Sequence, residues 1–336
     1  MAQPLRLAVA GLGASGRAHA QAAAAGGFKL VGVADLIPER LSSVAGPANV
    51  ALAVDEAMTL ATNSNVDALC ICLPTHLHVP IATAALKLGK AVMIELPPAP
   101  TSKDAKTLAK AAEKAGKPLV YSAVRRFGAA EQSARQAIDK GYVGPVYHAR
   151  LTALRTRGIP QGTGWYHDKE KTGGGAVVDL ALPLIDLLNY LIGPAKPQTV
   201  YAVAHDRLTK LPVEEAASVL IKFDTGASAE VSVAWALNQP PGQAGVVCRL
   251  SGEVGAVDVY TPQGPVVYRS FEKGQPKATP LKQPKVAGYD AMLRQFRAQI
   301  LGEASALPGP TEGVAMMGLA EAIYKSVATG RAVEVP

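Results

Sequence analysis

Three glycines near the N-terminus have the spacing of a loop that can hold a pyrophosphate. The loop follows the apolar, strand-like run Leu5–Ala10 and precedes the helix-like run Arg17–Ala25. Gly11 permits a tight turn, Gly13 lets the backbone approach the anion, and Gly16 lets the helix pack closely on the strand. The free N–H groups at the helix N-terminus then face the negative charge. We therefore predict dinucleotide binding by the whole loop: Gly11, Leu12, Gly13, Ala14, Ser15 and Gly16.

An aspartate at the end of the next strand-like run bears on which dinucleotide is bound. The run Lys29–Ala34 ends in Asp35, which lies 19 residues after Gly16. An acid at about 20 residues accepts hydrogen bonds from the adenosine ribose hydroxyls, and its charge repels a 2′-phosphate. Asp35 therefore predicts NAD rather than NADP as the cofactor. The alternative is that Asp35 only caps the helix that follows.

Strand-like and helix-like runs keep alternating up to residue 123, which is typical of a parallel sheet. The strand-like runs are Val66–Leu73, Lys90–Ile94 and Pro118–Ala123, and the helix-like runs between them are Val79–Gly89 and Ser102–Gly116. Ligands gather where the strands of such a sheet end. We therefore expect the cofactor also to meet the residues after two of these strands: Leu73, Pro74, Thr75 and His78, and then Glu95, Leu96 and Pro97.

The second part of the chain has a different pattern of apolar and polar residues. After Glu131–Lys140 and Val146–Leu154, a polar stretch (Arg155–Lys171) leads through three glycines into a long apolar helix, Ala176–Ile192. Short alternating runs then suggest a mainly antiparallel sheet, and the chain ends in two helices. The sheet runs are Thr199–His205, Ala217–Phe223, Ala227–Trp235, Gly245–Ser251, Gly255–Tyr260 and Pro265–Ser270, and the helices are Tyr289–Leu301 and Thr311–Thr329.

The predicted fold is α/β, with two domains in 336 residues. Residues 1–123 form an N-terminal Rossmann domain that binds a dinucleotide. Residues 124–336 form a C-terminal α+β domain for substrate binding and oligomerisation, with a large, mainly antiparallel open sheet. An open sheet face needs a cover, so we expect a homo-oligomer, either a dimer or a tetramer.

Composition narrows the class of protein. No apolar run reaches the roughly 18–20 residues of a membrane span, and no export signal is evident. The net charge is +7, but the basic residues are scattered and aromatic residues make up 5%, which argues against nucleic-acid binding. Three cysteines form no disulfide or metal framework, so we predict a cytoplasmic protein without a metal site.

Taken together, the motifs resemble those of the Gfo/Idh/MocA family of NAD(P)-dependent sugar and cyclitol oxidoreductases over nearly the whole chain. The resemblance implies a small, polyhydroxylated substrate. The segments that carry it are Gly11–Gly16, Pro74–His78, Glu95–Pro97, Arg126–Phe127, Arg157–Pro160, Trp165, Gly173–Asp186, Glu321–Tyr324 and Thr329–Arg331.

Two departures fall where the family does its chemistry. Leu96 stands at the lysine of the family's Glu-Lys-Pro, and Pro183 stands at the histidine of its Asp-x-Gly-x-His-x-x-Asp. Neither side chain can move a proton or stabilise an oxyanion. A positioned base contributes about 10²–10⁴-fold, so another group must supply the proton chemistry or the chemistry differs.

One candidate replacement is the segment just before the glycines. The resemblance places Trp165, Tyr166 and His167 beside the substrate, together with Arg126. An imidazole titrates near neutrality, so His167 can act as a base, with Tyr166 as a catalytic partner. The alternatives are a solvated loop histidine and a packed aromatic.

The other candidates are two acids of the apolar helix. Asp179 and Asp186 are seven residues apart, about two turns, so we expect both on one face. The resemblance places both, with Pro183, on the substrate side, and Asp179 is a catalytic candidate. The alternative is a helix N-terminal charge for Asp179 and an ion pair for Asp186.

Three functions remain open on the sequence alone. The first is an NAD-dependent oxidoreductase that acts on a sugar, cyclitol or related polyol with a rearranged proton relay. The second is an NAD-containing enzyme without net redox, such as a lyase, isomerase or glycosidase. The third is an inactive NAD-binding regulator. The polar, aromatic-rich segment from Trp165 to Lys171 favours a retained ligand pocket, and hence the first two.

Overall fold

The computed structural model describes residues 4–160, 164–193, 195–238, 245–269 and 277–336. Residues 161–163 of the polar stretch and Ser270, the expected end of a strand, lie outside the described residues. The chain forms two compact units, which we call the first and the second unit. The first comprises residues 1–124 and 286–317, and the second comprises residues 125–285 and 318–336.

The first unit is built on a parallel sheet of six strands within the described residues, in the order β3-β2-β1-β4-β5-β6. The strand order changes direction between β1 and β4, although the strands are parallel, and this order is that of a dinucleotide-binding sheet. The strands are β1 (Leu5–Ala10), β2 (Phe28–Ala34), β3 (Leu52–Val54), β4 (Ala68–Ile71), β5 (Ala91–Glu95) and β6 (Leu119–Ser122).

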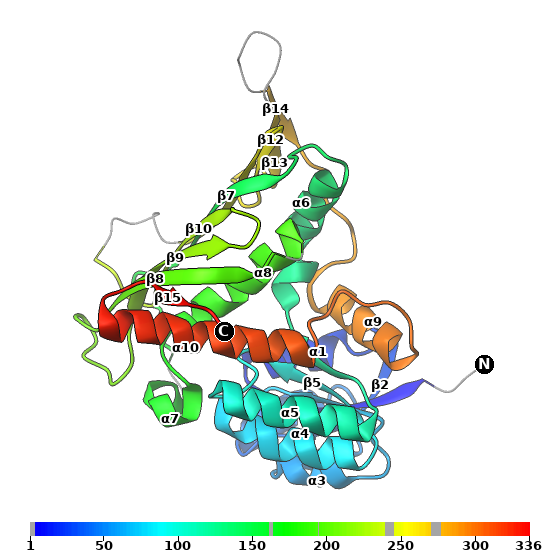
Figure 1. Cartoon of the computed structure of the whole chain (residues 1–336). Helices are drawn as coiled ribbons and strands as arrows, with labels where there is room; N and C mark the ends of the chain where they lie inside the picture. Colours follow the sequence, from blue (N-terminus) through cyan, green and yellow to red (C-terminus); the bar gives the residue numbers. More distant parts are fainter. Residues whose placement is uncertain (1–3, 161–163, 194, 239–244, 270–276) are drawn as a thin grey trace. The chain divides into compact units, whose positions relative to one another are not determined.

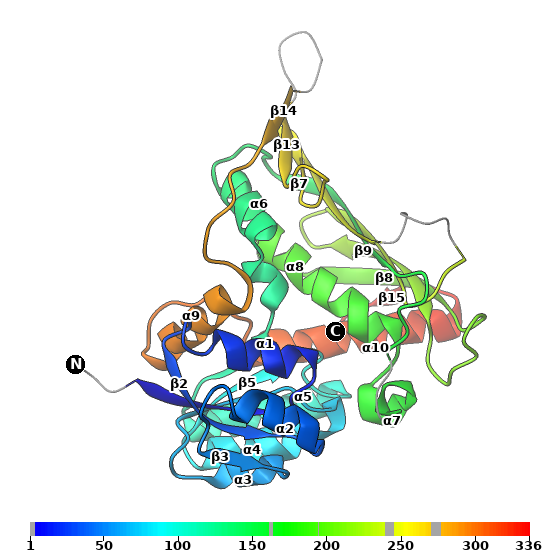
Figure 2. The ribbon, with the colours of Figure 1, turned by 180° about the vertical axis from the view of Figure 1, so that it is seen from behind.

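Helices cover both faces of this sheet, so its strands are apolar throughout. Helices α1 and α2 lie on one face, and α3, α4 and α5 lie on the other (Figures 1 and 2). Their bounds are α1 (Ala14–Ala22), α2 (Pro38–Ala45), α3 (Ala57–Thr62), α4 (His78–Lys87) and α5 (Ser102–Ala115). The sequence analysis did not identify α2, β3 or α3, which are short elements with little periodicity.

A late segment of the chain completes the first unit. Helix α9 (Gly288–Ile300) packs beside α1, and the ring of its Phe296 lies 5.8 Å from that of Phe28 on β2. Phe296 is fully buried there. The expected ranges 1–123 and 124–336 assign all of residues 286–317 to the second domain, whereas these residues pack with the first because they complete its core.

The second unit contains a sheet of nine strands among the described residues, in the order β14-β13-β12-β11-β7-β10-β9-β8-β15. All neighbouring pairs are antiparallel except β7 and β10. The strands are β7 (Val146–Leu154), β8 (Pro197–His205), β9 (Ala216–Phe223), β10 (Ser228–Ala234), β11 (Gly245–Gly252), β12 (Gly255–Asp258), β13 (Val266–Arg269), β14 (Lys277–Pro280) and β15 (Val333–Glu334). The predicted fold class is thus confirmed.

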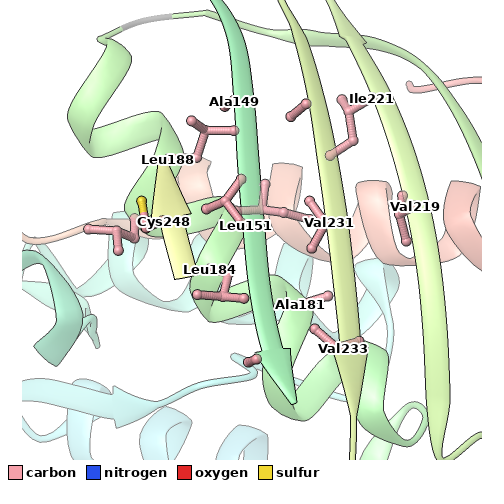
Figure 3. Close-up of a cluster of buried hydrophobic side chains, with 14 of the residues drawn as sticks. Ala149, Leu151, Ala181, Leu184, Leu188, Val219, Ile221, Val231, Val233 and Cys248 are labelled. Carbon is pink, nitrogen blue, oxygen red and sulfur yellow. The ribbon is translucent and has the colours of Figure 1, made fainter. Parts of the chain in front are cut away.

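Helices cover one face of the second sheet and form the core with it. They are α6 (Ala129–Asp139), α8 (Leu182–Ile192) and the later part of α10 (Pro310–Thr329), and a short helix α7 (Lys169–Thr172) precedes the glycines. Figure 3 shows side chains such as Leu151 and Val231 of the strands packed with Leu184 and Leu188 of α8. The helical run Lys169–Ile192 contains an 18-residue window with a mean hydropathy of 1.7, which is long and apolar enough for a membrane span, but 72% of that window is buried in this core.

The packing of α9 gives a stability prediction. We expect Phe296→Ala to lower the free energy of unfolding by about 3–5 kcal/mol, because it leaves a cavity against Phe28. The matched control is Leu301→Ala just after α9, where the side chain is 49% exposed, so a change within about 0.5 kcal/mol is expected. Urea unfolding of both variants measures this, and equal midpoints would contradict the assignment of α9 to the core.

Candidate functional site

The glycine loop is closely packed at Gly11 and Gly16 and open at Gly13, where the protein backbone is expected to approach the pyrophosphate. Gly11 has φ +87°, and a Cβ there would overlap the carbonyl oxygen of Cys72. A Cβ on Gly16 would overlap the carbonyl oxygen of Gly11, so this glycine permits the close packing of α1. No atom lies within 4 Å of a Cβ placed on Gly13. The loop thus has the geometry that its spacing predicts.

Asp35 fastens this loop to the end of β2. Its Oδ2 accepts a hydrogen bond from the backbone N–H of Leu12 at 2.7 Å, and its Oδ1 accepts one from Ile37 at 2.9 Å. The guanidinium of Arg40 lies 3.7 Å from Oδ2. Asp35 is 8% exposed. The carboxylate is therefore held in place at the edge where a ribose has to bind, and each oxygen keeps a lone pair for a hydroxyl.

The loops after β4 and β5 are tied together by His78. Its two ring nitrogens lie 2.9 Å from the carbonyl oxygen of Leu73 and 3.2 Å from that of Pro98. Burial lowers the pKa of His78, so the ring is neutral at physiological pH. A neutral ring has one N–H, so His78 donates to one of these carbonyl oxygens and places its other nitrogen beside the second. Both nitrogens therefore face the protein, and His78 orders the predicted cofactor edge. Thr75 beside it is also buried.

Beneath the glycine loop lies a side-chain cluster that the sequence analysis missed. His19 of α1 is fully buried, and its Nε2 lies 2.7 Å from Oε1 of Glu95 at the end of β5. The ring of Tyr289 from α9 packs edge-on against His19 at 4.9 Å, and the Ser122 hydroxyl lies 3.4 Å from Nε2. Glu95 is therefore fixed in orientation where the family's Glu-Lys-Pro motif begins, and Leu96 follows it.

Cys72 also lies in this cluster, so the three side chains form a possible metal-binding group. The candidate ligand atoms of His19, Cys72 and Glu95 lie within 4.8 Å of one another. However, the 2.7 Å between Nε2 and Oε1 is a hydrogen bond. Two ligands of one tetrahedral zinc lie about 3.3 Å apart. Burial also raises the pKa of the Cys72 thiol to about 12, so this side chain is a neutral thiol in the cluster as it stands. We describe the cluster as hydrogen-bonded.

In the second unit, Asp179 is the acid that the fold presents. Its Oδ2 accepts a hydrogen bond from Nε1 of Trp235 at 2.7 Å, and Nη1 of Arg155 lies 3.5 Å away. Trp235 is fully buried, whereas the side chain of Asp179 is 30% exposed. Burial raises the pKa of Asp179, and the contacts with Trp235 and Arg155 offset part of that rise. The net effect is that Asp179 takes up a proton at a higher pH than an ordinary aspartate does.

A π-helical turn, Val177–Ala181, carries Asp179 and changes the expected geometry of the two acids. Pro183 follows this turn and has no N–H, so it cannot form the regular α-helical bond to the carbonyl of Asp179. The expectation that Asp179 and Asp186 share one face assumes regular α-helical spacing, which this wider turn interrupts. Asp179 faces Trp235, while Asp186 faces Arg126.

Asp186 forms a buried ion pair. The guanidinium of Arg126 donates to both of its oxygens, with Nε at 2.8 Å and Nη2 at 2.5 Å. Asp186 is 4% exposed, and Arg126 also stacks 5.7 Å from the centre of the Tyr190 ring. The ion pair left open for Asp186 is thus present. The substrate contacts expected for Arg126 and Asp186 stay predictions.

The segment before the glycines holds the other candidates. The rings of Trp165 and Tyr166 stack with their centres 3.8 Å apart. His167 follows them in the same short turn, and its Nε2 is buried with no hydrogen-bond partner among the described residues. A buried ring nitrogen without a partner is costly, which makes His167 a candidate to bind a ligand.

Two family models match most of the chain. One, described as an oxidoreductase family with an NAD-binding Rossmann fold, matches residues 5–122. The other, the GFO/IDH/MocA C-terminal domain, matches residues 132–258. The match covers the glycine loop, Asp35 and Glu95 in the first unit, and Asp179 in the second.

Among curated proteins, the chain is similar to a putative UDP-kanosamine synthase oxidoreductase subunit of Amycolatopsis mediterranei, with 29% identity over 76% of this chain and 75% of that protein. It is 25% identical to D-glucoside 3-dehydrogenase of Escherichia coli over 99% of this chain and 98% of that protein. A solved structure of aldose-aldose oxidoreductase from Caulobacter crescentus, complexed with glycerol, aligns with a TM-score of 0.84 at 25% identity, over 99% of this chain and 100% of the other.

A solved levoglucosan dehydrogenase in complex with NADH and levoglucosan has the same fold, with a TM-score of 0.86 at 22% identity, over 99% of this chain and 100% of the other. The fold, the glycine loop and both family models lead to the same result. The chain belongs to the Gfo/Idh/MocA family of oxidoreductases, with an NAD-binding Rossmann domain.

Proposed function

We propose that this protein is an NAD-dependent enzyme that oxidises a hydroxyl group of a sugar, cyclitol or related polyol, or reduces the corresponding carbonyl, in a reducing cytoplasm. The named relatives support this substrate class, because their names refer to sugars or glucosides. The three cysteines are unpaired thiols, as a reducing compartment requires. The first of the three functions left open by the sequence is therefore the one that we favour.

The observation that carries the proposal is the incomplete pairing of the buried Asp179 carboxylate. A carboxylate that is mostly buried beside one indole N–H and a guanidinium at 3.5 Å is under-compensated, so its pKa rises. A structural acid would gain stability from full pairing, as Asp186 does with Arg126. Asp179 instead keeps an affinity for a proton, which is what a general base requires.

Oxidation of a hydroxyl group to a carbonyl removes a hydride and a proton from the substrate, so each needs an acceptor. Bound NAD supplies the hydride acceptor. The carboxylate of Asp179 takes the hydroxyl proton while the C–H bond of the same carbon breaks, and a carbonyl is left. In the reverse direction Asp179 returns that proton. Trp235 and Arg155 hold Oδ2, so the proton goes to Oδ1, for which the described residues provide no hydrogen bond.

His167 is the second candidate for the proton. Its Nε2 has no partner among the described residues, and the stacked pair Trp165 and Tyr166 beside it offers the apolar face that sugar rings pack on. We propose that this segment binds substrate, with Asp179 as the principal base in place of the family's histidine, which is Pro183 here.

A panel of polyols with NAD tests the reaction by NADH absorbance. On a substrate found in this way, we expect Asp179→Asn to lower kcat by about 10²–10⁴-fold, because the amide cannot accept the proton. Since the base must be ionised, oxidation should fall as the pH drops through the raised pKa of Asp179, above the ordinary range of an aspartate.

The matched control is Asp224→Asn, which removes an exposed carboxylate that accepts from the backbone N–H of Lys196 on the surface of the same unit. It should leave kcat within twofold or so of the parent, as for most surface changes. If His167→Ala abolishes turnover while Asp179→Asn does not, His167 is the base. Product formation seen by NMR without net NADH would instead favour a lyase or isomerase.

The position of Asp35 predicts the choice of cofactor. We expect calorimetry to show NAD binding at least about tenfold tighter than NADP, equivalent to 1.4 kcal/mol, because the 2′-phosphate meets this fixed carboxylate. Asp35→Ser should narrow the difference, since Arg40 remains to attract the phosphate. Tighter binding of NADP by the parent protein would overturn the assignment.

We also propose that the exposed face of the second sheet joins a second copy of the chain. Cross-strand neighbours place large apolar side chains in rows on this face, such as Tyr201 opposite Leu220, which are 41% and 54% exposed. Tyr147, Val203 and Val247 are also 40% exposed or more. Such a face on a free monomer is a liability for aggregation, and a two-fold contact covers it.

Light scattering after gel filtration tests this contact. We expect a dimer or tetramer for the parent chain and a shift towards monomer for Leu220→Asp, because the carboxylate would be buried without a partner. The control is Leu88→Asp after helix α4 of the first unit, where the side chain is 57% exposed, so the size of the assembly should not change. A monomeric parent chain would contradict the proposal.

A further inference from the structure

The three glycines before the Asp179 turn are each required by a different neighbour. Gly173 has φ +85° and ends helix α7. A Cβ on Gly174 would overlap the hydroxyl of Tyr324, and a Cβ on Gly175 would overlap the backbone oxygen of Glu214. The start of the helix is therefore pressed against two residues that are distant in sequence, Glu214 and Tyr324.

Glu214 makes most of the contacts at this point. Its Oε1 accepts hydrogen bonds from the backbone N–H groups of Gly175 at 3.0 Å and Val177 at 2.9 Å, and from the Tyr324 hydroxyl at 2.9 Å. Its backbone oxygen accepts from the N–H of Ala176 at 2.9 Å. Three successive N–H groups at a helix N-terminus are thus satisfied by one residue, whose charge also suits the helix dipole.

Helix α7, which follows Tyr166 and His167, also contacts Gly174 and Tyr324. The hydroxyl of Thr172, the last residue of α7, donates to the carbonyl of Gly174 at 2.7 Å. The ammonium of Lys169, the first residue of α7, lies 5.3 Å from the centre of the Tyr324 ring. Tyr324 thus contacts α7 through its ring and Glu214 through its hydroxyl.

We propose that Glu214 is a positioning residue, supported by Tyr324, that sets the place of Asp179 relative to Trp235 and Arg155. The proposal rests on the function proposed above, in which Asp179 is the base. Asp179 lies one turn after Gly175, and its backbone N–H donates to the Gly175 carbonyl at 3.1 Å. A shift at Gly175 is therefore passed directly to Asp179.

Tyr324 is suited to this support. Burial raises the pKa of Tyr324 well above its ordinary value, and the Glu214 carboxylate adds to that rise. The hydroxyl accordingly keeps its proton and donates to Oε1 throughout the working pH range. Glu214 and the helix start therefore keep one geometry while Asp179 gains and loses its proton.

The hydrogen bond between Trp235 and Asp179 provides a probe that needs no substrate. The chain has two tryptophans, so ¹⁵N-tryptophan labelling gives two indole N–H signals. The signal that persists in Trp165→Phe belongs to Trp235. Its position and its pH titration report the carboxylate of Asp179, and Asp179→Asn defines the position without that carboxylate.

We expect Glu214→Ala to move the Trp235 signal towards the position seen in Asp179→Asn and to change its titration midpoint. Glu214→Gln keeps an acceptor oxygen, so it should retain the parent position. Tyr324→Phe removes one of the three donors and should give an intermediate shift. If Glu214→Ala does not fold, Glu214→Gln and Tyr324→Phe still test the proposal, which fails if Tyr324→Phe leaves the signal unmoved.

The control is Glu215→Ala at the next residue. Glu215 is 2% exposed, and its side chain accepts from the N–H groups of Leu208 at 2.7 Å and Thr209 at 2.6 Å. Its backbone oxygen accepts from the backbone N–H of Trp235 at 2.8 Å, and the substitution keeps that backbone group in place. Its loss should lower stability without moving the Trp235 signal. A parent-like signal in folded Glu214→Ala, or an equal shift in Glu215→Ala, overturns the proposal.

Turnover provides the functional readout. On a substrate found with the panel, Glu214→Ala should lower kcat by up to about 100-fold, as expected for a misplaced base, and should change KM far less. The two proposals fail separately. Full turnover in Asp179→Asn would remove Asp179 as the base, whereas the Trp235 signal would still decide whether Glu214 positions it.

Discussion

A carboxylate that leaves water has to find donors or a cation, or else keep its proton, and this constraint distinguishes four acids of the second unit. Asp186 is paired by the guanidinium of Arg126. Glu214 and Glu215 are satisfied by backbone N–H groups. Asp179 has one indole N–H and a guanidinium at 3.5 Å, so it is the least compensated of the four. The structural acids are those with full sets of partners.

The first unit follows the same rule with a different outcome. Asp35 is fixed by two backbone N–H groups, and Glu95 is fixed by His19, so both present carboxylates of settled orientation. A ligand that meets such groups does not have to order them, which reduces the entropic cost of binding. These carboxylates of the first unit are therefore oriented before a ligand binds. In the second unit, the orientation of Asp179 depends on how its turn is held.

Much of the first unit was predictable because its signals are local. The glycine spacing, the position of Asp35 and the buried strands each follow from residues within about 20 positions of one another. Residues 286–317 could not be placed in this way, because the contact of Phe296 with Phe28 joins positions that are far apart in the sequence. The pairing of His19 with Glu95 was missed for the same reason.

In the second unit, the sequence identified Asp179 but not its surroundings. The helix was expected from its apolar residues, yet the π-helical turn depends on the missing N–H of Pro183 within a packed helix. Trp235 follows β10 and Glu214 precedes β9, so these residues reach Asp179 and the start of its helix only in the folded chain. The three glycines were visible in the sequence, but the neighbours that require them were not.

The way the chain passes between the two units has a consequence for its evolution and its engineering. It crosses three times, after residues 124, 285 and 317, and the last crossing lies inside helix α10. One cut in the chain therefore leaves the units joined by two other connections. Exchange of one unit with a relative by recombination takes more than one breakpoint, and one of these would have to interrupt a continuous helix. Inheritance as a single block is the simpler route, so the two units are expected to diverge together.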